Sequence, residues 1–489
     1  MLLMRDGTSA VAASDLMRVH LADVRSTLAG RSDLPGIQAR KLVRILREAA
    51  GSEIHGENLK EWRDSEFFRK MLGETPDRLL NEFFPAIPLL SRSTLRRSPL
   101  GALTRPMRHF LHYYESSGTT GDPVAAPKAV DDLIVNTMNI GEMWGRVLHE
   151  GDSALVLING PFAPAGYQFE KVLEYLGLTS VRLWVDQVTG DYSRVLRIIR
   201  ELGINTYVGA PSRLTELLQY ALSKGEPAPD FAKLLLIAEQ TGASFLRHLE
   251  GLTGATARVG TFGSSETGTV AVTCEFGALH TQPQSYLLEV HDEAGTRPVA
   301  EGRADAGELV VTTLDLPARP LVRYRTGDLV EVEGVPCPCG VRTPVLRPLG
   351  RQQDAAKLAR DGVRQEECEA VLWAPRDDRE PVVLNYMLVI KGDSVVCLVI
   401  TDRGTTAAWE EDLARRLDPL FTEHHVVART VPALPPLASM GAYVGWKLSR
   451  LVDLDDPALH GCLPPPLQEA VQQSLSQIER LTAHPAMAR

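Results

Sequence analysis

Cysteine is scarce in this sequence and is absent from its first half. Six cysteines occur among 489 residues, and the first of them is Cys274. Secreted domains that depend on disulfides carry a much denser set, so this usage is typical of a reducing compartment. We therefore expect a cytoplasmic protein that needs no disulfide framework to fold.

Long apolar runs are also missing. No uncharged apolar stretch approaches the ~18 residues of a membrane span, so we expect no membrane partner. The first twenty residues carry charges at Arg5, Asp6, Asp15 and Arg18. These charges leave no apolar core long enough for a secretory signal.

The sequence also has no excess of basic residues. Lys and Arg total 52 against 62 Asp and Glu, which gives a net charge of −10. An acidic chain without a basic block is a poor nucleic-acid binder, so we expect no nucleic-acid partner. What remains is ordinary globular composition, with 44% hydrophobic and 23% charged residues. At about 150 residues per domain, the length suggests about three structural units.

Two patterns divide the first 350 residues. Apolar residues at helical spacing, such as Leu42, Ile45 and Leu46, predict a helical region over residues 1–98. Residues 99–350 alternate short apolar runs with amphipathic stretches, which predicts β-α-β units and a parallel sheet covered by helices. The expected strands are 153–158, 181–185, 206–208 and 233–237, and the expected helices are 168–176, 193–202 and 214–222. From Tyr286 the pattern becomes richer in strands.

A change in composition follows Gly350 and Arg351. Apolar runs at 382–390 and 394–401 flank a Lys-Gly-Asp turn and predict a β-hairpin. A helix at about 407–417 and a strand at 426–431 come next. The expected fold class is therefore α/β: a large N-terminal domain with parallel and mixed sheets covered by helices, plus a small C-terminal α+β domain over residues 351–489.

The most informative motif combines hydroxyls and glycines in six residues. It reads Ser116-Ser117-Gly118-Thr119-Thr120-Gly121. Glycines let the backbone approach a phosphate closely, and hydroxyl and N–H groups then donate to its oxygens. The alternative is an ordinary flexible turn, which any such cluster resembles. The motif is not a Walker loop, because no Gly-Lys-Ser or Gly-Lys-Thr follows.

Two later motifs place a carboxylate in a loop. Thr261-Phe262-Gly263-Ser264-Ser265-Glu266 offers a glutamate that can hold a hard cation through oxygen. Its alternative is a solvated loop carboxylate. In Arg323-Tyr324-Arg325-Thr326-Gly327-Asp328, the aspartate can accept both hydroxyls of a ribose. The alternative there is a turn with an Arg–Asp surface pair.

The order of the three motifs resembles that of the adenylate-forming superfamily, which includes acyl- and aryl-CoA ligases, peptide-synthetase adenylation domains and luciferases. The chain is most similar to the phenylacetate–CoA ligase branch. Further agreement lies in Ala238-Glu239, in Cys337-Pro338-Cys339-Gly340, in Gly350-Arg351, and in Lys447 to Asp453, which matches a terminal Lys-x-x-Arg-x-x-Asp.

The resemblance implies an ATP-dependent, AMP-forming ligase that activates a carboxylic acid and transfers it to CoA. Residues Ser116 to Gly121 would hold the phosphates of ATP, Glu266 would bind Mg²⁺, and Ser265 would sit at the α-phosphate. Asp328 would take the ribose, with Arg351 nearby. Ala238, Glu239 and Thr261 to Gly263 would lie on the adenine side. Lys447 would reach in from a mobile C-terminal domain as a compact point charge; the alternative is an exposed solubilising lysine.

The acid pocket is expected after the strand at 153–158, where ligands sit in open α/β sheets. Asn159, Phe162 and Tyr167 follow this strand, and the two rings could wall the aromatic acid that the resemblance implies. Core packing is the alternative for both rings.

The cysteines support a separate hypothesis. One His and three Cys make a tetrahedral zinc set, and Cys274, His280, Cys337 and Cys339 supply it. Similar Cys, His and Cys-x-Cys positions occur in the phenylacetate–CoA ligase branch that the sequence resembles. The site would be structural, because four protein ligands leave no open position. The alternative is four metal-free side chains.

Some positions depart from the family pattern. Gln353 stands where relatives carry the hinge Asp, the charged loop 361–369 is shorter than usual, and Trp446 precedes the lysine in place of Gly. These changes support a second hypothesis, in which the acceptor is a carrier-protein thiol, an amine or another small nucleophile. A third hypothesis is a nucleotide-binding protein without catalysis. A homodimer would be unsurprising for this branch.

Overall fold

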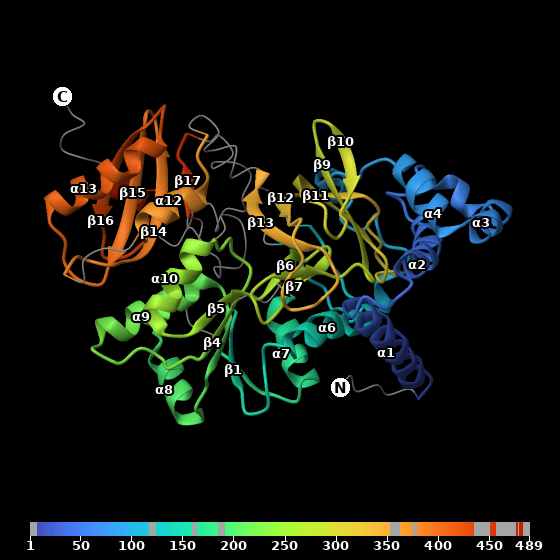
Figure 1. Ribbon diagram of the computed structural model, residues 1–489, viewed down its shortest axis with the longest axis horizontal. Helices are drawn as coiled ribbons and strands as arrows, with labels where there is room; N and C mark the ends of the chain where they lie inside the picture. The colour runs from blue at the N-terminus through green and yellow to red at the C-terminus, as the bar shows by residue number, and fades with distance from the viewer. Residues whose placement is uncertain are drawn as a thin grey trace.

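The computed structural model describes residues 7–116, 124–158, 164–183, 191–352, 362–374, 379–434, 450–455, 476–477 and 479–482. Within this part of the chain the strands form three sheets, two in the large N-terminal portion and one in the C-terminal portion. The C-terminal sheet lies beside α9 and α10, at the opposite end of the molecule from α2 and α3 (Figure 1).

The N-terminal hundred residues are helical, as their periodicity predicts. The helices are α1 (Gly7–Leu28), α2 (Leu34–Ala49), α3 (Ser65–Leu72), α4 (Pro76–Arg78) and α5 (Arg92–Arg97). Leu42, Ile45 and Leu46 on α2 are fully buried in a core that also holds Leu314. α1 packs along α6 (Val130–Trp144), where His20 Nε2 lies 2.9 Å from Asn139 Oδ1. The helical region is therefore part of the large domain's core.

A parallel sheet forms the middle of the molecule. Its strands are β1 (Ser153–Leu157), β2 (Thr179–Arg182), β3 (Thr206–Gly209), β4 (Lys233–Leu236) and β5 (Thr256–Val259), in the order β2-β1-β3-β4-β5. The connecting helices are α7 (Ala165–Tyr175), α8 (Ser193–Leu202), α9 (Pro211–Ser223) and α10 (Ala243–Thr253). Two apolar cores flank this sheet. The predicted alternation of strands and helices is confirmed.

The second sheet is antiparallel and has the order β10-β9-β11-β12-β13-β8-β7-β6. Its strands are β6 (Thr261–Ser264), β7 (Gly268–Thr273), β8 (Leu279–Thr281), β9 (Tyr286–Asp292), β10 (Gly295–Pro298), β11 (Asp305–Thr313), β12 (Tyr324–Val332) and β13 (Val345–Arg351). β5 and β6 are separated only by Gly260, so the two sheets meet where the Thr261 motif begins.

The third sheet has the order β16-β15-β14-β17 and its own apolar core. Its strands are β14 (Val383–Lys391), β15 (Ser394–Thr401), β16 (His425–Thr430) and β17 (Leu451–Asp453), with helices α12 (Gln365–Leu372) and α13 (Ala407–Leu417). The predicted hairpin, helix and strand all form within one residue of their expected bounds. Gly392, with a φ of 57°, supplies the left-handed turn between β14 and β15.

No helix in the described ranges combines the length and apolar character needed to cross a membrane.

Candidate active site

A cavity opens where the two sheets of the large domain meet. Residues from separate parts of the chain line it: Ser116, Ala238, Thr261, Gly263, Ser265, Glu266 and Arg351. Each belongs to a motif that the sequence marks for nucleotide binding. The structure therefore gathers, in one cavity, motifs that are up to 235 residues apart.

Glu266 lies at the turn between β6 and β7. Its side chain is buried, Oε1 lies 3.6 Å from Nη2 of Arg92, and Oε2 has no hydrogen-bond partner among the described residues. Burial alone would raise the pKa of Glu266, but the charges of Arg92 and Arg351 outweigh it and hold the pKa below its ordinary value. The result is an ionised carboxylate with one oxygen free for a ligand.

The backbone around Glu266 requires a glycine. A Cβ on Gly263 would lie 2.1 Å from the carbonyl oxygen of Gly268, so no other residue fits without moving the strand pair. Ser264 and Thr267 close the turn through mutual main-chain to hydroxyl bonds of 3.2 Å. This turn fixes the carboxylate in the cavity.

The phosphate motif begins at the tip of a short hairpin. The N–H of Ser116 donates to the carbonyl oxygen of Val124 at 2.9 Å, and the hydroxyl of Ser116 accepts from the N–H of Val124 at 2.8 Å. Ser116 lines the cavity. Ser117, Gly118, Thr119, Thr120 and Gly121 lie outside the described residues.

The adenine-side residues divide into two groups. Ala238 lines the cavity and has a left-handed φ of 73°, whereas Glu239 turns away and accepts from the N–H of Ser212 at 3.1 Å, at the start of α9. Thr261, Gly263 and Ser265 line the cavity. Phe262 does not, because its ring packs against the core of the antiparallel sheet.

Asp328 and Arg351 are cross-strand partners on β12 and β13. Oδ1 of Asp328 lies 3.0 Å from Nε of Arg351, and only Arg351 is among the residues that line the cavity. The aspartate is buried directly behind the guanidinium. Arg351 thus lies next to Asp328, as expected, and the pair stands in a sheet rather than on a surface turn.

The other end of the cavity is formed by α6 and α7. Leu133, Val135, Pro164, Ala165 and Phe169 give it apolar walls. Tyr167 does not line it, since its ring lies 4.6 Å from the imidazole of His112. Asn159 and Phe162 lie outside the described residues.

Sequence reasoning missed a group of charged and polar residues in and beside this cavity. Arg92, Lys128, Asp132, Asn136 and Gln168 line it, and Arg319 lies buried next to Glu266, with its Nη1 3.4 Å from the Glu266 carbonyl oxygen. Burial raises the pKa of Asp132 to about 6 and lowers the pKa of Lys128 to about 8. The available signal was a polar residue among apolar ones, such as Asp132 beside Leu133, Ile134 and Val135 on α6.

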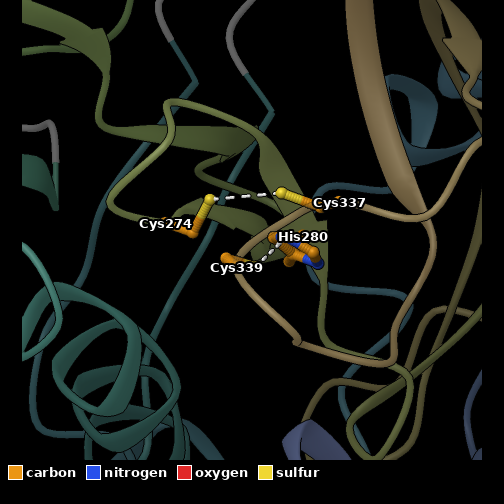
Figure 2. Close-up of side chains that lie close together, drawn as sticks. All are labelled: Cys274, His280, Cys337 and Cys339. Atoms are coloured by element: carbon orange, nitrogen blue, oxygen red, sulfur yellow. Dashed lines mark hydrogen bonds between the residues drawn. The ribbon is translucent and has the colours of Figure 1, made fainter.

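The cysteines and histidine converge at the far end of β7. The ligand atoms of Cys274, His280, Cys337 and Cys339 all lie within 4.8 Å of one another (Figure 2). The Sγ atoms of Cys274 and Cys337 are 3.8 Å apart, and Sγ of Cys339 is 3.2 Å from Nε2 of His280. Two Zn–S bonds of ~2.3 Å at a tetrahedral angle require a sulfur separation of ~3.8 Å.

The groups around this cluster suit metal ligation as well. His280 Nδ1 lies 3.2 Å from the carbonyl oxygen of Thr343, which fixes the tautomer that leaves Nε2 free. The N–H groups of Phe276 and Val341 donate to the sulfurs of Cys274 and Cys339 at 3.4 Å. The donor set and its surroundings therefore fit Zn²⁺. β7 separates the cluster from Glu266.

Comparisons with known proteins agree with this geometry. The chain is 27% identical to a phenylacetate–coenzyme A ligase of Thermus thermophilus over 361 residues, which is 68% of this chain and 75% of that protein. A phenylacetate–coenzyme A ligase of Pseudomonas putida is 26% identical over 272 residues, 53% of this chain and 60% of its own length. No family model matches the sequence.

A solved structure extends the likeness to nearly the whole fold. A 2-hydroxyisobutyryl-CoA ligase in the postadenylation state superposes with a TM-score of 0.68 at 17% identity, covering 92% of this chain and 93% of that one. The chain is thus similar, at a distance, to the adenylate-forming CoA ligases. The same ligase in its thioesterification state gives a TM-score of 0.55 at 18% identity, over 90% of this chain and 91% of that one. The arrangement of domains therefore resembles the first state more than the second.

Side chains of the large N-terminal portion and of the C-terminal portion meet between α10 and the C-terminal sheet. The Arg450 guanidinium lies 4.6 Å from the ring of Phe245 and 5.0 Å from that of Tyr386. Nδ2 of Asn385 donates to Oγ1 of Thr215 on α9 at 3.3 Å. Arg450 belongs to the terminal motif that contains Lys447, and Lys447 itself lies outside the described residues.

Proposed function

We propose that the chain is an AMP-forming acid–CoA ligase. The observation that carries the proposal is the convergence of Ser116, Ser265, Glu266 and Arg351 on one cavity that has an apolar end. A nucleotide and a carboxylic acid would lie together in such a space. The relatives named phenylacetate–coenzyme A ligase support the same reading, and the resemblance implies an aromatic acid.

The proposed reaction has two steps. A carboxylate oxygen of the acid attacks the α-phosphorus of ATP, the bond to the β-phosphate breaks, and pyrophosphate leaves. The thiolate of CoA then attacks the acyl carbon of the adenylate, and AMP leaves. Little covalent chemistry is required of the protein, so positioning and charge stabilisation dominate.

Most of the predicted residues have a role in this scheme. Ser116 and the loop to Gly121 hold the β- and γ-phosphates, and Ser265 contacts the α-phosphate. Ala238, Thr261 and Gly263 form the adenine side, and Asp328 with Arg351 binds the ribose. Glu239 and Phe262, which were also expected there, serve the start of α9 and the sheet core instead. Lys447 neutralises the charge that develops between the carboxylate and the α-phosphate. Asn159 and Phe162 remain predictions for the acid end, whereas Tyr167 packs against His112 and does not line the cavity.

Two metal ions complete the proposal. Glu266 would hold Mg²⁺, since its Oε2 is buried without a partner among the described residues and its carboxylate is ionised. The ion supplies charge neutralisation to the phosphates when it is bound. Cys274, His280, Cys337 and Cys339 would hold a structural Zn²⁺ that ties β7 and β8 to the loop before β13.

The proposed domain division places the hinge at the end of β13. Residues 1–98 and 99–350 would act as one body, and residues 351–489 would rotate to exchange the adenylation and thiol-transfer arrangements. The cytoplasmic location and a homodimer stay predictions.

A pyrophosphate assay tests the proposal. Release from ATP and Mg²⁺ is measured across a panel of aryl, arylacetic, hydroxy and amino acids, with and without CoA. We expect release that requires an acid and that CoA converts into rapid turnover. No acid-dependent release would contradict the proposal. Release that CoA does not accelerate would favour another acceptor, which the departures at Gln353 and Trp446 make the second candidate.

A further inference from the structure

A buried lysine lines the acid-binding end of the cavity. Lys128 is only 7% exposed, and it lies at the end of the strand segment that returns from the phosphate loop. Its main-chain groups pair with His112, but its Nζ has no hydrogen bond or ion pair within the described part of the chain. Burying an ammonium group without a partner is costly, so such a group in a cavity indicates a missing ligand.

Two amide side chains in the same cavity each use one polar atom in a hydrogen bond and have the other polar atom available. Oδ1 of Asn136 accepts from the N–H of Thr269 at 2.9 Å, which leaves its amino group as a donor toward the cavity. Nε2 of Gln168 donates to Oγ1 of Thr137 at 2.9 Å, which leaves its carbonyl oxygen. The cavity therefore offers an ammonium group and an amide donor beside apolar walls.

The hairpin register separates Lys128 from the phosphate loop. Ser116, where the phosphate motif begins, pairs with Val124 at one end of the hairpin, whereas Lys128 pairs with His112 at the other end. Four residues at ~3.3 Å each place Lys128 ~13 Å along the strand from the loop. His112 in turn contacts Tyr167 on α7, the helix that lines the acid end. Lys128 is thus on the acid side of the hairpin. The carboxylate of Asp132, and more weakly that of Glu266, act on its charge from a distance without an ion pair.

We propose that Lys128, together with Asn136, binds a second oxygen-bearing group on the carboxylic acid. This inference rests on the proposed function, because it names the class of acid that the same cavity takes. The substrate class is an aryl or arylacetic acid with a carboxylate or phenolic oxygen on the ring. An unsubstituted acid would leave the ammonium group without a hydrogen-bond acceptor, and sites built around a buried polar group reject such analogues strongly.

The test compares phenylacetate, 4-hydroxyphenylacetate and 4-carboxyphenylacetate in ATP–pyrophosphate exchange. We expect wild-type kcat/KM to favour a substituted acid by roughly 100-fold. Lys128→Met should remove most of that preference, with the loss confined to the substituted acids. The exposed Lys224→Met is the matched control and should behave as wild type.

Equilibrium binding separates this inference from the proposed function. Each acid is titrated by calorimetry into wild type and into Lys128→Met, after circular dichroism has shown that both are folded. If wild type binds a substituted acid more tightly than phenylacetate and Lys128→Met does not, the inference is supported, even when no ATP–pyrophosphate exchange is detected. A raised KM for ATP with every acid would assign Lys128 to the phosphates and overturn the inference. Equal binding of all three acids by wild type, or no binding of any, would overturn it too.

Discussion

The indole of Trp373 lies face to face with the imidazole of His248, with ring centroids 4.7 Å apart and planes 10° apart. Trp373 follows α12 of the C-terminal domain, and His248 lies on α10 of the large domain. The same indole stacks on Phe245 at 4.5 Å. These rings hold the C-terminal sheet against α10 in the arrangement that resembles the postadenylation state.

Loss of this stack should weaken domain docking. Each aromatic pair contributes ~0.5–1.5 kcal/mol beyond its buried area, and Trp373 makes two such pairs, so Trp373→Ala should lower the docking equilibrium constant by roughly 5- to 150-fold. We expect a comparable loss of adenylate formation and a normal rate of thioester formation from adenylate that is supplied ready-made. Trp373→Phe, which keeps a stacking ring, is the control. If Trp373→Ala slows both half-reactions equally, the stack has no preference between arrangements.

Glu266 should be essential for adenylation. Glu266→Gln keeps the shape of the side chain and removes the charge that a cation requires. We expect acid-dependent pyrophosphate release to fall by roughly 10²- to 10³-fold, and the Mg²⁺ concentration for half-maximal rate to rise. The exposed Glu57→Gln serves as the control. An unchanged Mg²⁺ dependence in Glu266→Gln would contradict the assignment of Glu266 as the residue that holds Mg²⁺.

Lys447 should act in chemistry and contribute nothing to the fold. We expect Lys447→Ala to lower adenylate formation by orders of magnitude at an unchanged melting temperature. Adenylation at the wild-type rate in this variant would show that the terminal motif has another purpose. Pyrophosphate exchange and thermal melting, measured on one preparation, decide between these results.

The cysteine cluster should bind zinc. We expect about one equivalent per chain by elemental analysis, and a lower melting temperature after chelation, because the metal ties the β7–β8 hairpin to the loop before β13. Cys337→Ser should lose the metal, whereas Cys462→Ser should keep it. If metal-free protein melts at the same temperature as the purified protein, the cluster does not hold a stabilising metal.

His55 should make stability depend on pH. Its side chain is 3% exposed, and burial lowers its pKa to about 4 from an ordinary value of 6.5. The folded state then binds fewer protons than the unfolded state between those values, so stability falls as the pH drops from about 6.5 to 4. At pH 5 the two pKa values correspond to a loss of about 2 kcal/mol from this group. His55→Gln should show a smaller fall in melting temperature between pH 7 and pH 5; an identical fall would exclude His55 as a cause.

Local signals predicted the parallel sheet and the C-terminal hairpin well, because their strands are short apolar runs bounded by turn residues. The bounds of α8 and α13 agree with their expected ranges. The order of the antiparallel sheet could not be predicted, since the register between β13 and β8 joins Val345 to His280 across 65 residues. Such pairing depends on long-range packing that no local pattern records.

The candidate site also contains some residues that could be predicted from the sequence and others that could not. Motifs with glycine and hydroxyl residues were visible in sequence, because tight turns and phosphate contacts restrict residue choice. Arg92, Lys128 and Asp132 were not, since one charged residue on an otherwise ordinary helix or strand resembles any solvated position. Only burial in the fold distinguishes them. The distinction between Ala238, which lines the cavity, and Glu239, which caps α9, also required the backbone path.

Ala238 carries a consequence for protein engineering. A left-handed φ of 73° costs an alanine roughly 1 kcal/mol and a β-branched residue more, and this residue faces the cavity. Substitutions at position 238 would therefore change the strain in the backbone as well as the shape of the cavity: glycine relieves the strain, and valine or isoleucine increases it. Designers who want a new acid specificity should vary the walls on α6 and α7 and leave this position alone.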